Sequence, residues 1–108
     1  MPESGGRRPA ETPELRRLRR RIDVLDRRIV TLLNERATLA REAGRAKSTA
    51  GRTAIRDAER EREVLLRVSM ANEGPLPQAD LLALYRRLFA ATRSLETRDR
   101  ERGRTDGS

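Results

Sequence analysis

The chain has 108 residues, enough for one compact domain, and carries a formal net charge of +8. Charged residues make up 39% of it and hydrophobic residues 35%, with one tyrosine and one phenylalanine as the aromatic residues. Because there is no cysteine and no histidine, disulfides, thiolate nucleophiles, imidazole bases and the usual zinc sites are excluded. The positive excess favours anionic partners, and any chemistry must use carboxylates, guanidinium groups, hydroxyls and the single lysine amine.

The two ends differ in composition from the middle of the chain. We expect disordered tails over residues 1–12 and 98–108, because neither has enough apolar surface to offset the entropy lost on ordering. The folded domain is then expected over residues 13–97. The first residues lack the apolar core of a signal peptide, and no later run approaches membrane-spanning length. A cytoplasmic location without membrane contact is the default expectation.

The first predicted helix begins at Thr12-Pro13, where a hydroxyl can cap and proline suits the first helical position, and it extends for about 35 residues. At 1.5 Å per residue it would be about 50 Å long, more than two shorter helices can cover in one monomer. Its apolar positions recur in steps of three and four, which is typical of a helix with one continuous apolar seam. These positions are Leu15, Leu18, Ile22, Leu25, Ile29, Leu32, Leu39, Ala43 and Ala46.

Two shorter helices are predicted after a loop at residues 48–53. A stop signal and a turn at residues 72–77 separate them. Their expected bounds are about Ile55–Ala71 and about Gln78–Thr97. We therefore predict an all-α fold with one long and two shorter helices per chain. Because the long apolar seam needs a second chain to cover it, we expect an intertwined homodimeric helical bundle.

Polar residues interrupt the predicted apolar faces. Arg36 stands in the seam of the first helix, and Lys47 follows about three turns later on nearly the same side, which suggests an anion site. Thr92 and Glu96, spaced by four, continue the inward side of the third helix. Each has an ordinary alternative, such as a snorkelling arginine or a solvated glutamate near a chain end. Together they predict a polar pocket in a bundle core.

Five motifs in a fixed order give the chain its most specific signal, over about residues 15–97. They are Leu18–Asp26, Leu32–Arg36, Gly44–Lys47, Arg56–Glu61 and Leu84–Phe89. In this order and spacing the chain resembles the all-helical chorismate mutase family. The resemblance implies an isomerase that converts chorismate to prephenate in phenylalanine and tyrosine biosynthesis, with no cofactor and no metal. Chorismate is a dianion, and its rearrangement is a concerted intramolecular [3,3] shift that needs no nucleophile.

The resemblance also assigns roles to individual residues. Arg36 resembles the arginine that grips a substrate carboxylate from the first helix. Arg19 resembles the arginine that reaches into the site of the partner subunit, which requires the homodimer. Lys47 occupies the place of the lysine that donates to the ether oxygen of the breaking bond. The further expected substrate-binding residues are Asp57, Arg60, Glu61, Thr92 and Glu96.

Glu96 departs from the bacterial pattern, which commonly has a glutamine donating to the same ether oxygen. An ionised glutamate cannot donate, so Glu96 would have to be protonated through burial to do the same work. Fungal members of the family use glutamate in the corresponding role. Lys47, Glu96 and Arg36 are the residues that we expect to be catalytic.

Two alternatives remain open on the sequence. The same fold acts in related proteins on 4-amino-4-deoxychorismate, or on isochorismate as a pyruvate lyase, although Glu61 favours a substrate that bears a hydroxyl. An arginine-rich helical nucleic-acid binder would use Leu15–Arg21 as its footprint. Interspersed acidic residues and the lack of stacking aromatics make nucleic acid an unlikely partner. The charged run at residues 56–63 is, taken alone, more often a salt-bridged helix face.

Overall fold

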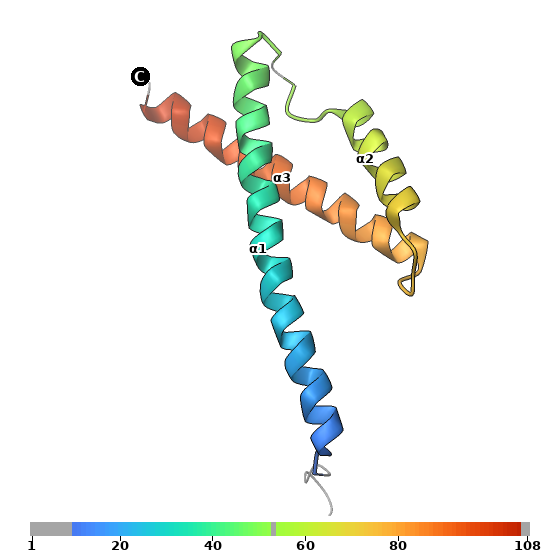
Figure 1. Ribbon diagram of the computed structural model, residues 1–108. Coiled ribbons are helices and arrows are strands. Elements are labelled where there is room, and N and C mark those ends of the chain that lie inside the picture. The colour runs from blue at the N-terminus through green and yellow to red at the C-terminus, as the bar shows by residue number, and fades with distance from the viewer. Residues whose placement is uncertain (1–9, 53, 107–108) are drawn as a thin grey trace, which may run out of the picture. The chain divides into compact units, whose positions relative to one another are not determined.

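A computed structural model describes residues 10–52 and 54–106 (Figure 1). Its regular elements within these ranges are three α-helices: α1 (Pro13–Thr49), α2 (Ala58–Ala71) and α3 (Gln78–Asp106). The all-α prediction with one long and two shorter helices is thereby confirmed for the described residues. The chain divides into two units within α1: the first ends at Arg36, and the second begins at Ala37 and contains α2 and α3.

The start of α1 is fixed by a hydroxyl cap, as the sequence predicts. The backbone N–H of Leu15 donates to the Thr12 hydroxyl at 3.1 Å, which satisfies one of the unpaired donors of the first turn. Pro13 fills the first helical position, where its missing N–H costs nothing. Residues 10–12 of the predicted N-terminal tail precede the helix without regular structure, and residues 1–9 lie outside the described residues. The helix ends at Thr49, so the loop begins two residues later than predicted.

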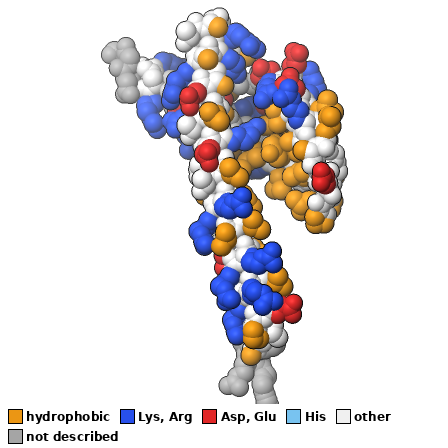
Figure 2. All heavy atoms as spheres, in the orientation of Figure 1, with side chains coloured by type: hydrophobic (Ala, Val, Ile, Leu, Met, Phe, Trp, Pro, Cys, Tyr) orange, Lys and Arg blue, Asp and Glu red, His pale blue; other side chains and the backbone are white. Residues whose placement is uncertain are grey.

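The first unit exposes most of its large apolar side chains. Their exposed fractions run from 37% for Leu15 to 59% for Leu32, and no residue of α1 is buried. Figure 2 shows apolar side chains (orange) interspersed with basic ones (blue) along this helix. The exposed large apolar side chains of the first unit are Leu15, Leu18, Ile22, Val24, Leu25, Ile29, Val30, Leu32 and Leu33. This face offers apolar surface whose removal from water would be favourable.

The second unit has its own small core where α2 packs against α3. Phe89 of α3 is the buried hydrophobic residue among those that the structure describes, with 6% of its surface exposed. The ring of Tyr85, one turn earlier, meets it edge to face with 6.3 Å between the ring centroids. Val64, Leu65 and Val68, on the predicted apolar side of α2, are half-buried.

Both ends of α2 are set by polar side chains. The helix begins at Ala58, three residues after the predicted start, because the Asp57 carboxylate accepts from the backbone N–H of Arg60 at 3.0 Å and caps the first turn. At the other end Asn72 accepts from the N–H of Gly74 at 3.0 Å. Gly74 has a φ of +80°, a conformation that L side chains rarely adopt, which explains glycine at this turn.

The length of α3 corrects the prediction at the C-terminus. The helix begins at Gln78 as expected but continues to Asp106, so residues 98–106 are helical and do not form a disordered tail. The physical reason is a tertiary contact, since Asp99 in this extension forms an ion pair with Arg41 of α1. Such a pair stabilises a segment whose own apolar content is low.

Candidate functional site

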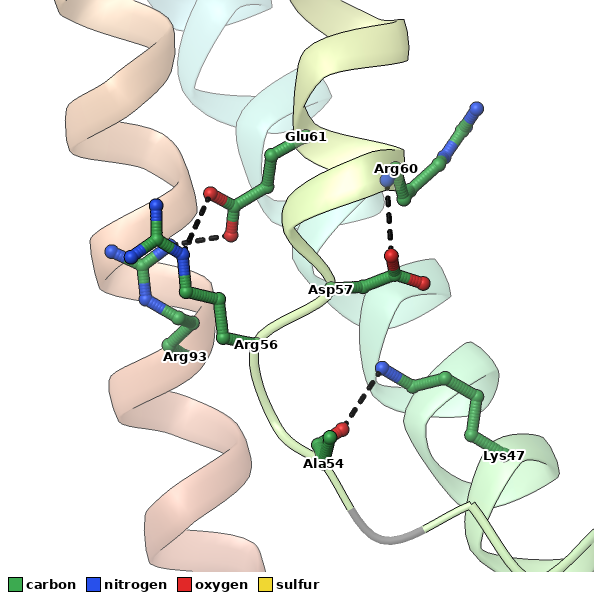
Figure 3. Close-up of polar contacts among 7 residues, drawn as sticks. All are labelled: Lys47, Ala54, Arg56, Asp57, Arg60, Glu61 and Arg93. Atoms are coloured by element: carbon green, nitrogen blue, oxygen red, sulfur yellow. Dashed lines mark hydrogen bonds and ion pairs between the residues drawn. The ribbon is translucent and has the colours of Figure 1, made fainter.

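Lys47 lies at the last turn of α1, close to the loop that leads into α2. Its side chain is half-buried, and its ammonium donates to the carbonyl oxygen of Ala54 at 3.5 Å (Figure 3). The positive charge of Lys47 adds to the lowering of the pKa of Asp57 and opposes the rise that burial causes in the pKa of Glu96. The structure thus brings Lys47 of α1, Asp57 before α2 and Glu96 of α3 into one neighbourhood, although they lie far apart in the sequence.

The Asp57 carboxylate caps the N-terminus of α2. Its pKa is held below the ordinary value chiefly by the hydrogen bond from the Arg60 N–H, with smaller contributions from the charges of Arg52, Lys47 and Arg60. Burial acts in the opposite direction and is outweighed. Asp57 is therefore an ionised capping residue beside Lys47, and its position helps to fix where α2 begins.

Glu61 is held between two arginines. Its carboxylate accepts from the Nη1 of Arg93 on α3 at 2.5 Å, and the Nε of Arg56 lies 3.6 Å from its other oxygen (Figure 3). The Glu61 side chain is 17% exposed, so both ion pairs are partly shielded from water. The two arginines fix the carboxylate and leave it lone pairs for a further donor, such as a ligand hydroxyl.

The Arg60 guanidinium does not join this group. Its Nη1 bonds to Glu63 on the same helix, and its side chain points away from Arg56, Glu61 and Arg93 (Figure 3). The pair is solvent-exposed, with 55% of the Arg60 side chain accessible, and exposed pairs of this kind contribute little stability. Arg60 can therefore exchange Glu63 for another anion at small cost.

Glu96 lies against the backbone of α1. A Cβ atom placed on Gly44 would be 3.4 Å from the Glu96 Cδ, so the glycine leaves room for the carboxyl group to approach closely. Burial raises the pKa of Glu96 above its ordinary value, and Asp99 adds to the rise, while Lys47 and Arg100 oppose it. Thr92, one turn earlier on α3, is also half-buried. Their predicted inward orientation agrees with this burial.

A hollow of about 350 Å³ opens between the end of α1 and α3. Glu96 belongs to its lining, whereas Lys47, Asp57 and Glu61 do not. The lining residues are Arg41, Gly44, Arg45, Ser48, Thr49, Glu96, Asp99 and Arg100. The hollow in a single chain therefore contains only one of the residues predicted from the sequence.

The remaining predicted residues lie in the first unit. Arg36 is half-buried on α1. The Arg19 guanidinium forms an ion pair with Glu11 and its side chain is 54% exposed. An exposed pair is a weak restraint, so the Arg19 side chain is available for another anion.

Four functional candidates were missed from the sequence. Arg56 and Arg93 hold Glu61, and Arg41 and Asp99 join α1 to α3. Arg93 carries a local signal, because it follows the buried Phe89 by one helical turn. Asp99 carries none, because its partner is 58 residues away.

Two further findings concern the described residues as a whole. No group of three or more Asp, Glu, His or Cys side chains among them is arranged to hold a metal ion. None of the three helices combines the length and the apolar content that crossing a membrane would require.

Comparison with known families gives one match over most of the chain. The profile of the family described as chorismate mutase type II matches residues 18–97. These residues include all the predicted site positions and end two residues before Asp99.

Curated relatives and solved structures agree with this match. The chain is 42% identical over 87 residues to a bifunctional chorismate mutase/prephenate dehydratase of Aquifex aeolicus, covering 77% of this chain and 24% of the relative. It is 36% identical to the protein of the same name from Stutzerimonas stutzeri, covering 81% and 25%. The chain thus spans about a quarter of these relatives. The structure of a chorismate mutase from Thermus thermophilus superposes with a TM-score of 0.74 at 34% identity, covering 79% of this chain and 96% of that one.

Proposed function

Since the chain belongs to the chorismate mutase type II family, we propose that it catalyses the rearrangement of chorismate to prephenate. The observation that carries the proposal is the place of Glu96, which is half-buried against Gly44 of α1, where the charge of Lys47 acts on its carboxyl group. The reaction develops negative charge on the ether oxygen as the C–O bond breaks. An ammonium and a neutral carboxylic acid are two donors that stabilise such charge.

The chain's other charged residues suit the two carboxylates of the substrate. In our proposal Arg36 and Arg19 of the partner subunit hold these carboxylates, with Arg60 released from Glu63 to assist. Glu61, fixed by Arg56 and Arg93, accepts from the ring hydroxyl. Holding the enolpyruvyl side chain over the ring in a reactive conformer removes much of the entropic part of the barrier. Thr92 and Asp57 are the remaining polar residues that we propose to contact the substrate.

We propose that the active form is a homodimer in which two α1 helices cover each other's apolar face. The exposure of the apolar seam before Arg36 supports this arrangement, at Leu15, Leu18, Ile22, Leu25, Ile29 and Leu32. At about 25 cal/mol per Å² of buried apolar surface, a face of this kind supplies a strong drive for association. A symmetric dimer would bring two copies of Arg19 to two equivalent sites.

The proposal is tested with the purified full chain and three substrates: chorismate, isochorismate and 4-amino-4-deoxychorismate. We expect enzymatic turnover of chorismate to prephenate, with the other two compounds converted much more slowly. A preference for the aminated or the isomeric compound would keep the fold and overturn the substrate assignment. Absence of turnover on all three would overturn the enzymatic proposal.

A matched pair of variants separates a specific carboxylate site from general attraction of an anion. Arg36→Met and Arg28→Met remove the same charge from the same helix, and Arg28 is exposed. We expect Arg36→Met to raise the KM for chorismate by at least about tenfold, because a charge-assisted bidentate contact is lost. The KM of Arg28→Met should stay within about twofold, as expected for loss of an exposed charge.

A further inference from the structure

The ion pair between Arg41 and Asp99 joins α1 to the C-terminal extension of α3. The Arg41 Nε donates to the Asp99 Oδ2 at 2.9 Å, and its Nη2 donates to Oδ1 at 2.8 Å. The two side chains are half-buried, with exposed fractions of 34% and 27%. Two parallel charge-assisted hydrogen bonds constrain both the distance and the relative orientation of the groups. This pair therefore restrains its two helices more tightly than a single contact would.

The pair lies one helical turn from the contact between Gly44 and Glu96. Gly44 follows Arg41 by three residues, and Glu96 precedes Asp99 by three residues. Residues three apart share a helix face, so the two contacts lie in succession along one line between the helices. Lys47 comes three residues after Gly44 on the same face of α1. The Arg41–Asp99 pair therefore ties α1 to α3 one helical turn from the Glu96 carboxyl group.

We propose that Arg41 and Asp99 are positioning residues, which hold Glu96 against Gly44 and within reach of the reacting bond beside Lys47. This inference rests on the proposed function, because it assigns to the pair a part in placing a catalytic group. Asp99 lies beyond residue 97, where the match to the family ends. In this proposal the helical extension of α3 supplies Asp99, a positioning residue that lies outside the residues matched by the family.

The position of the Glu96 carboxyl group must be held accurately for it to donate to the reacting bond. At Gly44 itself α1 presents no side chain to Glu96, so the neighbouring ion pair supplies a directional restraint that the glycine does not. A carboxyl donor that is displaced by about 1 Å can lower the rate of a reaction by up to about hundredfold. Loss of the pair should therefore lower kcat more than it raises KM, because the donor acts on charge that develops in the transition state.

The test uses the double variant Arg41→Met/Asp99→Asn, which removes the pair without changing the net charge or leaving one partner unpaired. Arg62→Met is the control, because Arg62 is an exposed arginine of α2 that does not line the hollow around Glu96. We expect kcat for chorismate to fall about tenfold in the double variant with KM changed less than about twofold. Arg62→Met should keep both parameters within about twofold of the starting protein.

A double-mutant cycle shows whether the pair acts through Glu96. In a Glu96→Ala background the Arg41→Met/Asp99→Asn change should lower kcat by less than about twofold, because the group to be positioned is already gone. An equal tenfold loss in both backgrounds would show a purely structural role and would overturn the inference. Unchanged kcat in the double variant with Glu96 present would overturn it as well. Circular dichroism confirms that each variant keeps its helical content.

A second readout does not depend on turnover and so separates this inference from the proposed function. Carbon-13 NMR of glutamate carboxyl groups, with Glu96→Gln to assign the signal, follows the titration of Glu96. The facing charged groups are Lys47 from α1 and Arg100 and Asp99 from α3. In Arg41→Met/Asp99→Asn we expect the pKa of Glu96 to fall, because Asp99 no longer raises it and the freed carboxyl group is better hydrated. An unchanged pKa would overturn the positioning of Glu96 even if the chain acts on another substrate.

Discussion

The two units of the chain differ in how far they bury their apolar side chains and in the polar contacts they form. The first unit, up to Arg36, is a helix with its large apolar side chains exposed. The second unit has the Phe89 core, ion pairs between helices, and the carboxyl groups whose pKa values depart from their ordinary values. In the proposed homodimer a second chain covers the apolar face of the first unit, whereas the second unit brings Lys47 and Glu96 near each other from its own helices. The proposed enzyme requires both.

The largest effect is expected from a charge placed in the apolar face of the first unit. Ile22 is 54% exposed in the single chain, and Ile22→Asp would bury a carboxylate in the proposed dimer interface. We expect dissociation and an activity loss of at least about hundredfold, because an unpaired buried charge costs several kcal/mol. Analytical ultracentrifugation and turnover of chorismate measure the two effects.

The matched control for this change lies in the second unit. Met70 of α2 is 78% exposed, and Met70→Asp introduces the same charge on a helix surface. We expect Met70→Asp to remain a dimer with nearly unchanged turnover. If Ile22→Asp stays dimeric and active, the apolar face of the first unit is not the dimer interface, and the contrast between the two units is wrong.

The next largest effect is expected at Lys47 in the second unit. Lys47→Met should lower kcat by about 100- to 1,000-fold, since it removes a donor to developing negative charge. Lys47→Arg should restore little of this, because a planar guanidinium does not replace a compact ammonium. Arg62→Met, which removes the charge of an exposed arginine on α2, is the control for charge loss. Near-normal kcat in Lys47→Met would contradict the role assigned to this lysine.

A smaller and pH-dependent effect is expected at Glu96. Because burial raises its pKa and only the protonated carboxyl group can donate, activity should fall as the pH rises through that raised pKa. The linked contribution to stability has the same sign: it is fully present below the ordinary glutamate pKa and is lost as the pH rises through the folded-state value. Glu96→Gln should flatten the pH–rate profile on its alkaline side.

The control for this profile is Glu42→Gln, the same change at an exposed position of α1. Its pH–rate profile should match that of the starting protein. A profile that keeps its alkaline limb in Glu96→Gln would assign the limb to another group and would contradict the neutral-glutamate hypothesis.

Local signals account for what the sequence predicted well. The Thr12-Pro13 cap, the start of α3 at Gln78 and the three-helix order all depend on residues close together in the chain. The late start of α2 was missed because Ile55 extends the apolar pattern, while the Asp57 cap determines the first turn. The inward faces that carry Lys47, Thr92 and Glu96 were predicted because helical periodicity places them.

Contacts between distant residues account for what was missed. Asp99 in the helical extension of α3 meets Arg41, and Glu61 meets Arg93, which is 32 residues away. Helical periodicity places Arg93 one turn after Phe89 but does not identify its partner. The charged composition of residues 98–106 resembles that of a disordered tail, so composition alone gave the wrong answer there. The resemblance places Arg60 in the site, and this stays a prediction, since its guanidinium bonds to Glu63 on the same helix in the single chain.

The smallest effect is expected on the melting temperature, when the cap of α2 is removed. Its dependence on protein concentration distinguishes the two units. The pKa of Asp57 is lowered mainly by its hydrogen bond from the Arg60 N–H, so its contribution to stability is present above the ordinary aspartate pKa and is lost as the pH falls through the lowered value. Asp57→Ala should lower the Tm by a few degrees at neutral pH, and Asp57→Asn by less, because an amide oxygen still caps.

Because the cap belongs to the second unit, the difference in Tm between Asp57→Ala and the starting protein should not depend on protein concentration. The difference caused by a first-unit variant such as Leu25→Ala should grow as the protein is diluted, since dimer dissociation is linked to unfolding. Differential scanning calorimetry across a hundredfold range of concentration measures both. Equal concentration dependence for the two variants would mean that the fold of the second unit also requires the partner chain, and that the units differ in exposed surface but not in autonomy.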